Sequence, residues 1–113
     1  MSHETPATII EELRRLTAEA SKGPNAVFEA ETKVAECELT YDTQYNQSIM
    51  SGSGTAVEKT AQAKLDAGQA KFALDLAKAE LNRVKLKLKQ LESAQVAVSV
   101  ISRLVELEWR TTK

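Results

Sequence analysis

Residue types that carry out catalysis or bind metals are scarce in this chain, and their spacing is unsuited to both tasks. His3 is the single histidine and Cys37 the single cysteine of 113 residues. A zinc site needs several such ligands at short spacing, which one distant pair does not supply. Cys37 also falls on an apolar helix stripe, where a buried thiol is commoner than a nucleophile. We therefore expect no catalytic residue, metal site or cofactor, and a protein that is not an enzyme.

Basic residues form the most suggestive polar pattern. Lys64, Lys71, Lys78 and Lys85 recur every seven residues and so share one helix stripe. The favoured interpretation is that Lys64 to Lys78 pair with acidic residues of the preceding helix, as charges beside a coiled-coil seam do. Those acidic residues are Glu29, Glu31, Glu36 and Glu38.

The alternative interpretation is a patch for nucleic acid or for an acidic protein, made of Arg83, Lys85, Lys87 and Lys89. Phosphate contacts of this kind need clustered positive charge. Stacking on bases also needs aromatic side chains, and none is interleaved here. Balanced overall charge, with 15 basic and 16 acidic residues, also makes nucleic acid the less favoured partner.

The segment that must position these lysines carries a heptad repeat. Between Thr55 and Trp109 there is no proline, and small or apolar residues recur at alternating steps of four and three. Such a repeat is typical of a helix that packs along its length. The series comprises Ala63, Ala67, Ala70, Leu74, Ala77, Leu81, Val84, Leu88, Leu91, Gln95, Val98, Ser102, Val105 and Trp109. We expect one long helix over about 55–109.

Two shorter helices precede it. A frayed segment at 1–5 leads to a helix over about 6–20, with Thr5-Pro6 or Thr8 and Glu11 at its start. Gly23 suits the C′ position of that helix, and Pro24 prevents its continuation. A second helix over about 25–49 ends before a Ser/Gly turn at 51–54, and Thr55 caps the next helix.

A short turn between two heptad-bearing helices predicts an antiparallel pair. The chain is therefore expected to be one all-α domain, an elongated helical hairpin or coiled coil. Alanines of the long helix allow close approach, and we expect Phe28, Tyr41 and Tyr45 to fill the seam from the other side. Helix 6–20 either extends along the end of the long helix or folds back beside helix 25–49.

The last part of the long helix is apolar on several sides, more than helix 6–20 can cover. Exposed apolar surface of that extent indicates a partner. We expect a homodimer or higher oligomer, parallel or antiparallel, and an unidentified protein partner. The predicted interface consists of Leu88, Leu91, Val98, Ile101, Leu104, Val105 and Trp109.

The cellular compartment is inferred from what the sequence lacks. No stretch of about 18 uncharged apolar residues is present, so we expect no membrane contact. The N-terminus has no basic stretch followed by an apolar run, and one cysteine fits a reducing compartment. We expect a cytoplasmic protein.

Three stretches carry a resemblance in layout: Thr55 to Glu58, Ala63 to Ala67 and Leu74 to Glu80, together with the late segment 99–109. In this layout the chain resembles small coiled-coil proteins of unknown role encoded by tailed bacteriophages. The resemblance implies a phage accessory or adaptor protein in the host cytoplasm. The two alternatives are a DNA-associated factor in replication or recombination, which would use the basic patch, and an inhibitor of a host defence system.

Overall fold

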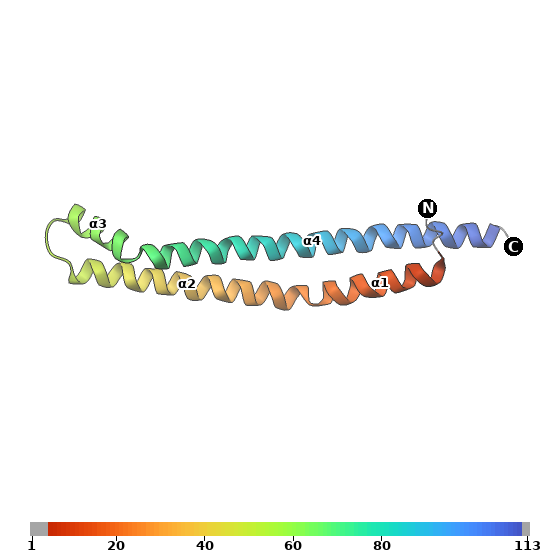
Figure 1. Ribbon diagram of the computed structural model, residues 1–113, viewed down its shortest axis with the longest axis horizontal. Helices are drawn as coiled ribbons and strands as arrows, with labels where there is room; N and C mark the ends of the chain where they lie inside the picture. The colour runs from red at the N-terminus through yellow and green to blue at the C-terminus, as the bar shows by residue number, and fades with distance from the viewer. Residues whose placement is uncertain (1–4, 112–113) are drawn as a thin grey trace. The chain divides into compact units, whose positions relative to one another are not determined.

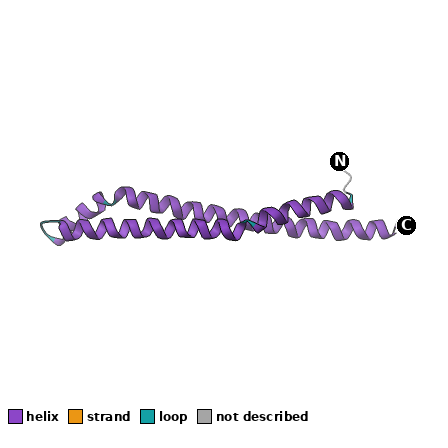
Figure 2. Cartoon of the chain, turned by 90° about the horizontal axis from the view of Figure 1, so that it is seen from below, coloured by secondary structure: helices purple, strands orange, loops and turns teal. Residues whose placement is uncertain are grey.

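The computed structural model describes residues 5–111, and within them the chain is helical apart from short connections (Figures 1 and 2). Its elements are α1 (Pro6–Ser21), α2 (Gly23–Ser51), α3 (Ala56–Asp66) and α4 (Gly68–Thr111). The all-α prediction is confirmed. Of the frayed segment expected at 1–5, Thr5 is ordered as the cap of α1, whereas residues 1–4, which include His3, lie outside the described residues.

The helices form two compact units. The terminal unit contains residues 5–25 and 85–111, which are α1, the start of α2 and the C-terminal part of α4. The hairpin unit contains residues 26–84, which are the rest of α2, α3 and the first part of α4. None of the described helices is long and apolar enough to cross a membrane.

The start of α1 is capped by Thr5, followed by Pro6 in the first turn. The Thr5 side chain accepts a hydrogen bond from the backbone N–H of Thr8 at 3.2 Å, and the Thr8 hydroxyl accepts one from the Thr5 backbone N–H at 3.0 Å. Two N–H groups that lack an intrahelical partner are satisfied in this way. Of the two predicted caps, Thr5-Pro6 is the one formed.

The junction between α1 and α2 is shorter than the sequence indicates. Lys22 caps α1 in the right-handed region at φ −80°, and α2 begins directly at Gly23. Among the described glycines only Gly54 has a positive φ. Gly23 therefore follows the C-cap directly, at the predicted C′ position, but without the left-handed conformation usual there. Gly23 is buried, and its missing side chain leaves room for Leu88.

In the hairpin unit, a short loop after Ser51 reverses the chain. Gly54 adopts φ +103°, which side-chain-bearing residues rarely adopt, and the Thr55 side chain then caps α3 by accepting from the N–H of Glu58. Ser48 contacts Asp66, while Tyr41 contacts Lys71 farther along. From the first pair to the second, the residue number falls on α2 and rises from α3 to α4. The helices are therefore antiparallel, as predicted.

The core of the hairpin unit is the small-residue seam expected from the heptad. The buried side chains are Ala63, Ala67, Ala70, Leu74 and Ala77. Tyr41 and Tyr45 lie half-buried opposite, with ring centroids 5.9 Å apart. Phe28 does not join them, since 68% of it is exposed, so that part of the prediction is wrong.

The expected single helix over 55–109 is interrupted at Ala67. This residue has φ −95° and ψ 9°, and Figure 1 shows α3 at an angle to α4. Backbone hydrogen bonds of 2.9 Å from Ala67 to Ala63 and from Lys71 to Ala67 continue across the change of direction. The interruption is therefore a kink, and it occurs beside Gly68, the residue of the segment with the weakest helix preference.

In the terminal unit, α1 lies antiparallel to the C-terminal part of α4. Ile9 and Leu16 are its buried side chains, with 2% and 4% exposed. The amide Nε2 of Gln95 donates to the Thr17 hydroxyl at 3.0 Å. Of the two placements considered for the first helix, the one along the end of the long helix is correct.

Candidate partner-binding surface

The terminal unit presents an apolar face on α4, which we call the α4 face. Its members have between 43% and 63% of their surface exposed, although all are large and apolar: Val96, Val100, Ile101, Leu104 and Leu107. Spacings of three and four place most of them on one side of the helix. Contiguous apolar surface of this kind marks interaction sites in soluble proteins.

The predicted interface residues divide into two groups. Leu88, Leu91, Val98 and Val105 are half-buried and share the heptad series of Gln95, which contacts α1. α1 therefore already covers part of their surface. The exposed group is Ile101 (43%), Leu104 (58%) and Trp109 (49%). The predicted interface omits Val96, Val100 and Leu107, which lie outside the heptad series, although it includes Ile101 and Leu104, which lie outside that series as well.

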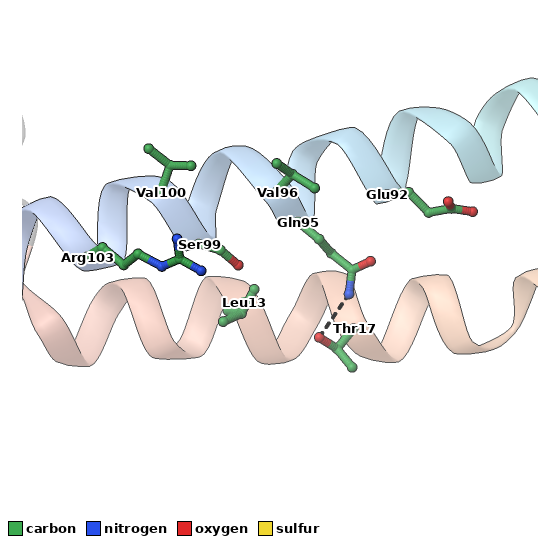
Figure 3. A pocket seen from close by; sticks show the side chains of 8 residues that line it. All are labelled: Leu13, Thr17, Glu92, Gln95, Val96, Ser99, Val100 and Arg103. Carbon is green, nitrogen blue, oxygen red and sulfur yellow. Dashed lines mark hydrogen bonds between the residues drawn. The ribbon is translucent and has the colours of Figure 1, made fainter.

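A groove runs between α1 and α4 within the terminal unit (Figure 3). It has a volume of about 650 Å³ and is open to solvent. In Figure 3, Gln95 and Ser99 point toward α1, whereas Val96 and Val100 point away from it. The lining residues are Leu13, Thr17, Glu92, Gln95, Val96, Ser99, Val100 and Arg103. The apolar edge of the groove, formed by Val96 and Val100, therefore lies beside a polar wall formed by Gln95 and Ser99.

Charged groups stand at both ends of this groove. Glu92 lies at one end of its α4 wall and Arg103 at the other, eleven residues apart. Four ion pairs join two described residues, and each joins positions three or four apart on one helix or at its end: Glu12–Arg15, Glu19–Lys22, Lys71–Asp75 and Glu80–Arg83. Glu92 and Arg103 belong to none of them, so both charges can pair with a partner.

The four basic residues predicted to form a patch are all exposed. Successive members are two residues apart on a helix, which turns each about 200° from the last. Arg83 and Lys87 therefore share one side of α4, while Lys85 and Lys89 share the opposite side. Arg83 also forms hydrogen bonds of 2.7 and 2.9 Å with the Glu80 carboxylate. These bonds hold the pKa of Glu80 below its ordinary value and occupy the guanidinium. Helix geometry thus divides the patch into two pairs.

The expected pairing of Lys64, Lys71 and Lys78 with the acids of α2 is wrong. In the described chain, none of the three lysines forms an ion pair with α2. Lys71 instead pairs with Asp75 on its own helix at 3.4 Å, and its Nζ lies 5.6 Å from the centroid of the Tyr41 ring. The contact between the lysine stripe and α2 is therefore a cation–π interaction.

Other polar clusters within residues 5–111 are small. No group of three or more His, Cys, Asp or Glu side chains there is placed to hold a metal ion. Cys37 is a free thiol, half-buried on α2. At the closed end of the hairpin unit, Asp66 accepts hydrogen bonds from Ser48 at 2.5 Å and from Gln62 at 2.8 Å. The first of these bonds is the larger cause of a lowered Asp66 pKa.

The α4 face and the groove beside it are thus the features of the described chain best suited to binding another molecule. A scan of protein-family models, a search of curated proteins and a search of solved structures found no match to this chain.

Proposed function

We propose that this protein is a non-enzymatic protein–protein interaction module that self-associates through the α4 face. The observation that carries the proposal is the exposure of five large apolar side chains on one short stretch of helix. Burial of such a side chain stabilises a complex by about 1.5–3 kcal/mol relative to leaving it in water. Among the described residues of the same unit, Ile9 and Leu16 are the large apolar side chains that are buried, with 2% and 4% exposed. The terminal unit thus leaves more large apolar side chains exposed than it buries.

A second protein partner fits the same surface. The layout shared with coiled-coil proteins of tailed bacteriophages supports a small phage accessory or adaptor protein that binds a host or phage protein. Such a protein would act in the cytoplasm of the host. Grooves between helices commonly accept an amphipathic helix, which reads the apolar face at helical spacing.

Sedimentation velocity over about 1–200 μM tests self-association, and the wild-type chain should sediment as a dimer or larger species at the upper end. Glu substitutions at Val96 and Val100, which belong to the α4 face and also line the groove, should give a monomer, with helix content unchanged by circular dichroism.

The matched control is Phe72→Glu with Leu76→Glu, two residues of the hairpin unit with 65% and 55% exposed. This variant should keep the wild-type assembly. A wild-type chain that stays monomeric at 200 μM contradicts the proposal. Loss of assembly in the Phe72 and Leu76 variant alone would transfer the interface to the hairpin unit.

A further inference from the structure

We propose that the partner at the groove is a second copy of this chain, whose α4 lies antiparallel with the two-fold axis passing near Ala97 and Val98. The inference rests on the proposed self-association and specifies its geometry. A two-fold dimer requires a surface that is complementary to itself, in which residue i meets j and j meets i. The α4 wall of the groove meets that condition.

The charges around this point are arranged antisymmetrically. Glu92 and Arg103 are equidistant from the midpoint of Ala97 and Val98, on opposite sides and with opposite charge. Lys89 and Glu106 form a second such pair farther out. In an antiparallel dimer each charge would therefore face its opposite on the second copy. In a parallel dimer each of these charges would face an identical one.

These residues also lie on the same side of α4. Lys89, Glu92, Val96, Ser99, Arg103 and Glu106 follow one another at steps of three and four, which is the spacing of a helix-packing face. All but half-buried Ser99 are exposed, and in the described chain none of the four charged members forms an ion pair. The second copy would supply the counter-charges.

Valine side chains lie near the centre of the same arrangement. Val96 has 63% of its surface exposed and Val100 has 48%. The proposed axis places Val96 opposite Ser99 of the second copy, twice by symmetry, and Val100 opposite Gln95. Leu13 of α1 is half-buried and lines the same groove. The product is a bundle of two α1 and two α4 segments with Val96 and Ser99 at its centre and charged flanks.

Charge exchange tests the contact. Glu92→Arg and Arg103→Glu should each raise the dimer dissociation constant about tenfold or more, because each replaces two attractions with two repulsions. The double variant should restore the wild-type constant. Glu92 and Arg103 are eleven residues apart, about 16 Å along one helix, so restoration reports a contact between copies rather than within one. Lys87→Glu, on the opposite side of α4 from Lys89, is the control and should leave the constant within about twofold.

A distance measurement tests the orientation. Nitroxide labels at Arg110→Cys, in a Cys37→Ser background, should lie about 35–40 Å apart in the antiparallel dimer. A parallel dimer would bring them within about 20 Å, given helix axes about 10 Å apart. A monomeric wild type would overturn both the proposed function and this inference. A dimer whose dissociation constant is unaffected by Glu92→Arg and Arg103→Glu, or whose labels lie within 20 Å, would overturn the inference alone.

Discussion

Leu88 packs directly over Gly23, which lies at the first residue of α2. A Cβ atom built on Gly23 would lie 2.9 Å from Leu88 Cδ2 and 3.0 Å from Leu88 Cγ, and nearer still to Cδ1. The absence of a side chain at Gly23 is thus a packing requirement of the terminal unit. The same contact brings the end of α1 close to α4.

Gly23→Ala should lower the free energy of unfolding by about 1 kcal/mol, because overpacking outweighs the gain in helix preference. Urea unfolding at one fixed protein concentration measures this change. In a Leu88→Ala background the same substitution should be neutral or stabilising. If Gly23→Ala stabilises the wild-type chain, Leu88 does not restrict this position.

Gly68→Ala should change the free energy of unfolding in the opposite direction to Gly23→Ala. A Cβ on Gly68 would have no neighbour within 4 Å, and the residue begins α4 without a positive φ. Alanine there should raise the free energy of unfolding by about 0.5–1 kcal/mol, mainly by restricting the unfolded chain. Thermal unfolding of the Gly68→Ala and Gly23→Ala variants, each against wild type, measures the two changes. Destabilisation would mean that packing of the hairpin unit requires glycine at the kink.

Ser48→Ala should raise the pKa of Asp66 toward its ordinary value, because it removes the larger of the two causes that lower it. The lowered pKa stabilises the folded chain above the ordinary aspartate pKa, about 3.9, and this contribution is lost as the pH falls through the lowered pKa. Carboxyl NMR titration of Asp66 measures the change. Gln62→Ala should produce a smaller rise, and equal pKa values in wild type and Ser48→Ala would contradict the assignment.

Thr17→Val should lower the free energy of unfolding by about 0.5–1 kcal/mol through loss of the Gln95 hydrogen bond. A double-mutant cycle of Thr17→Val with Gln95→Ala should give a coupling energy of about 0.5 kcal/mol. The control cycle pairs Thr17→Val with Ser99→Ala, which also lines the groove, and should be additive. Additivity in both cycles would show that the bond contributes nothing in solution.

DNA binding through the basic residues should be weak. Because Arg83 with Lys87 and Lys85 with Lys89 lie on opposite sides of α4, one duplex can contact only one pair. The logarithm of any binding constant should then fall with log salt no more steeply than about −2. Mobility-shift assays between 25 and about 150 mM salt measure this slope. A slope near −4 would mean that all four residues contact phosphate together.

The heptad repeat predicts the hairpin core well, because small residues at seam positions have one stable environment. Ala63, Ala70 and Ala77 are buried where the repeat places them. Phe28 lies beside its stripe rather than on it, and a wide stripe does not tell which apolar side chains a narrow alanine seam will cover. Gly23 was assigned from its chain neighbour Pro24, whereas its burial depends on Leu88, 65 residues away.

The kink at Ala67 and the position of the lysines depend on energies that the repeat does not contain. A heptad continues through Ala67 and Gly68 without interruption, so periodicity alone predicts a straight helix. Lys71 has both Asp75 and the Tyr41 ring within reach, and such surface contacts differ by less than about 1 kcal/mol. The groove beside α1 was missed because it depends on which side of α4 the first helix occupies.

The Thr17–Gln95 bond has a consequence for the order of folding. It joins residues 78 positions apart, whereas the Ser48–Asp66 bond joins residues only 18 apart. Closing the longer loop costs more chain entropy, and contacts near in sequence form faster. The hairpin unit should therefore form first, beginning at the Gly54 turn, and shorten the loop that the terminal unit has to close. A chain emerging from the ribosome would release the hairpin segment before the second half of α4, so the α4 face would form after the hairpin core.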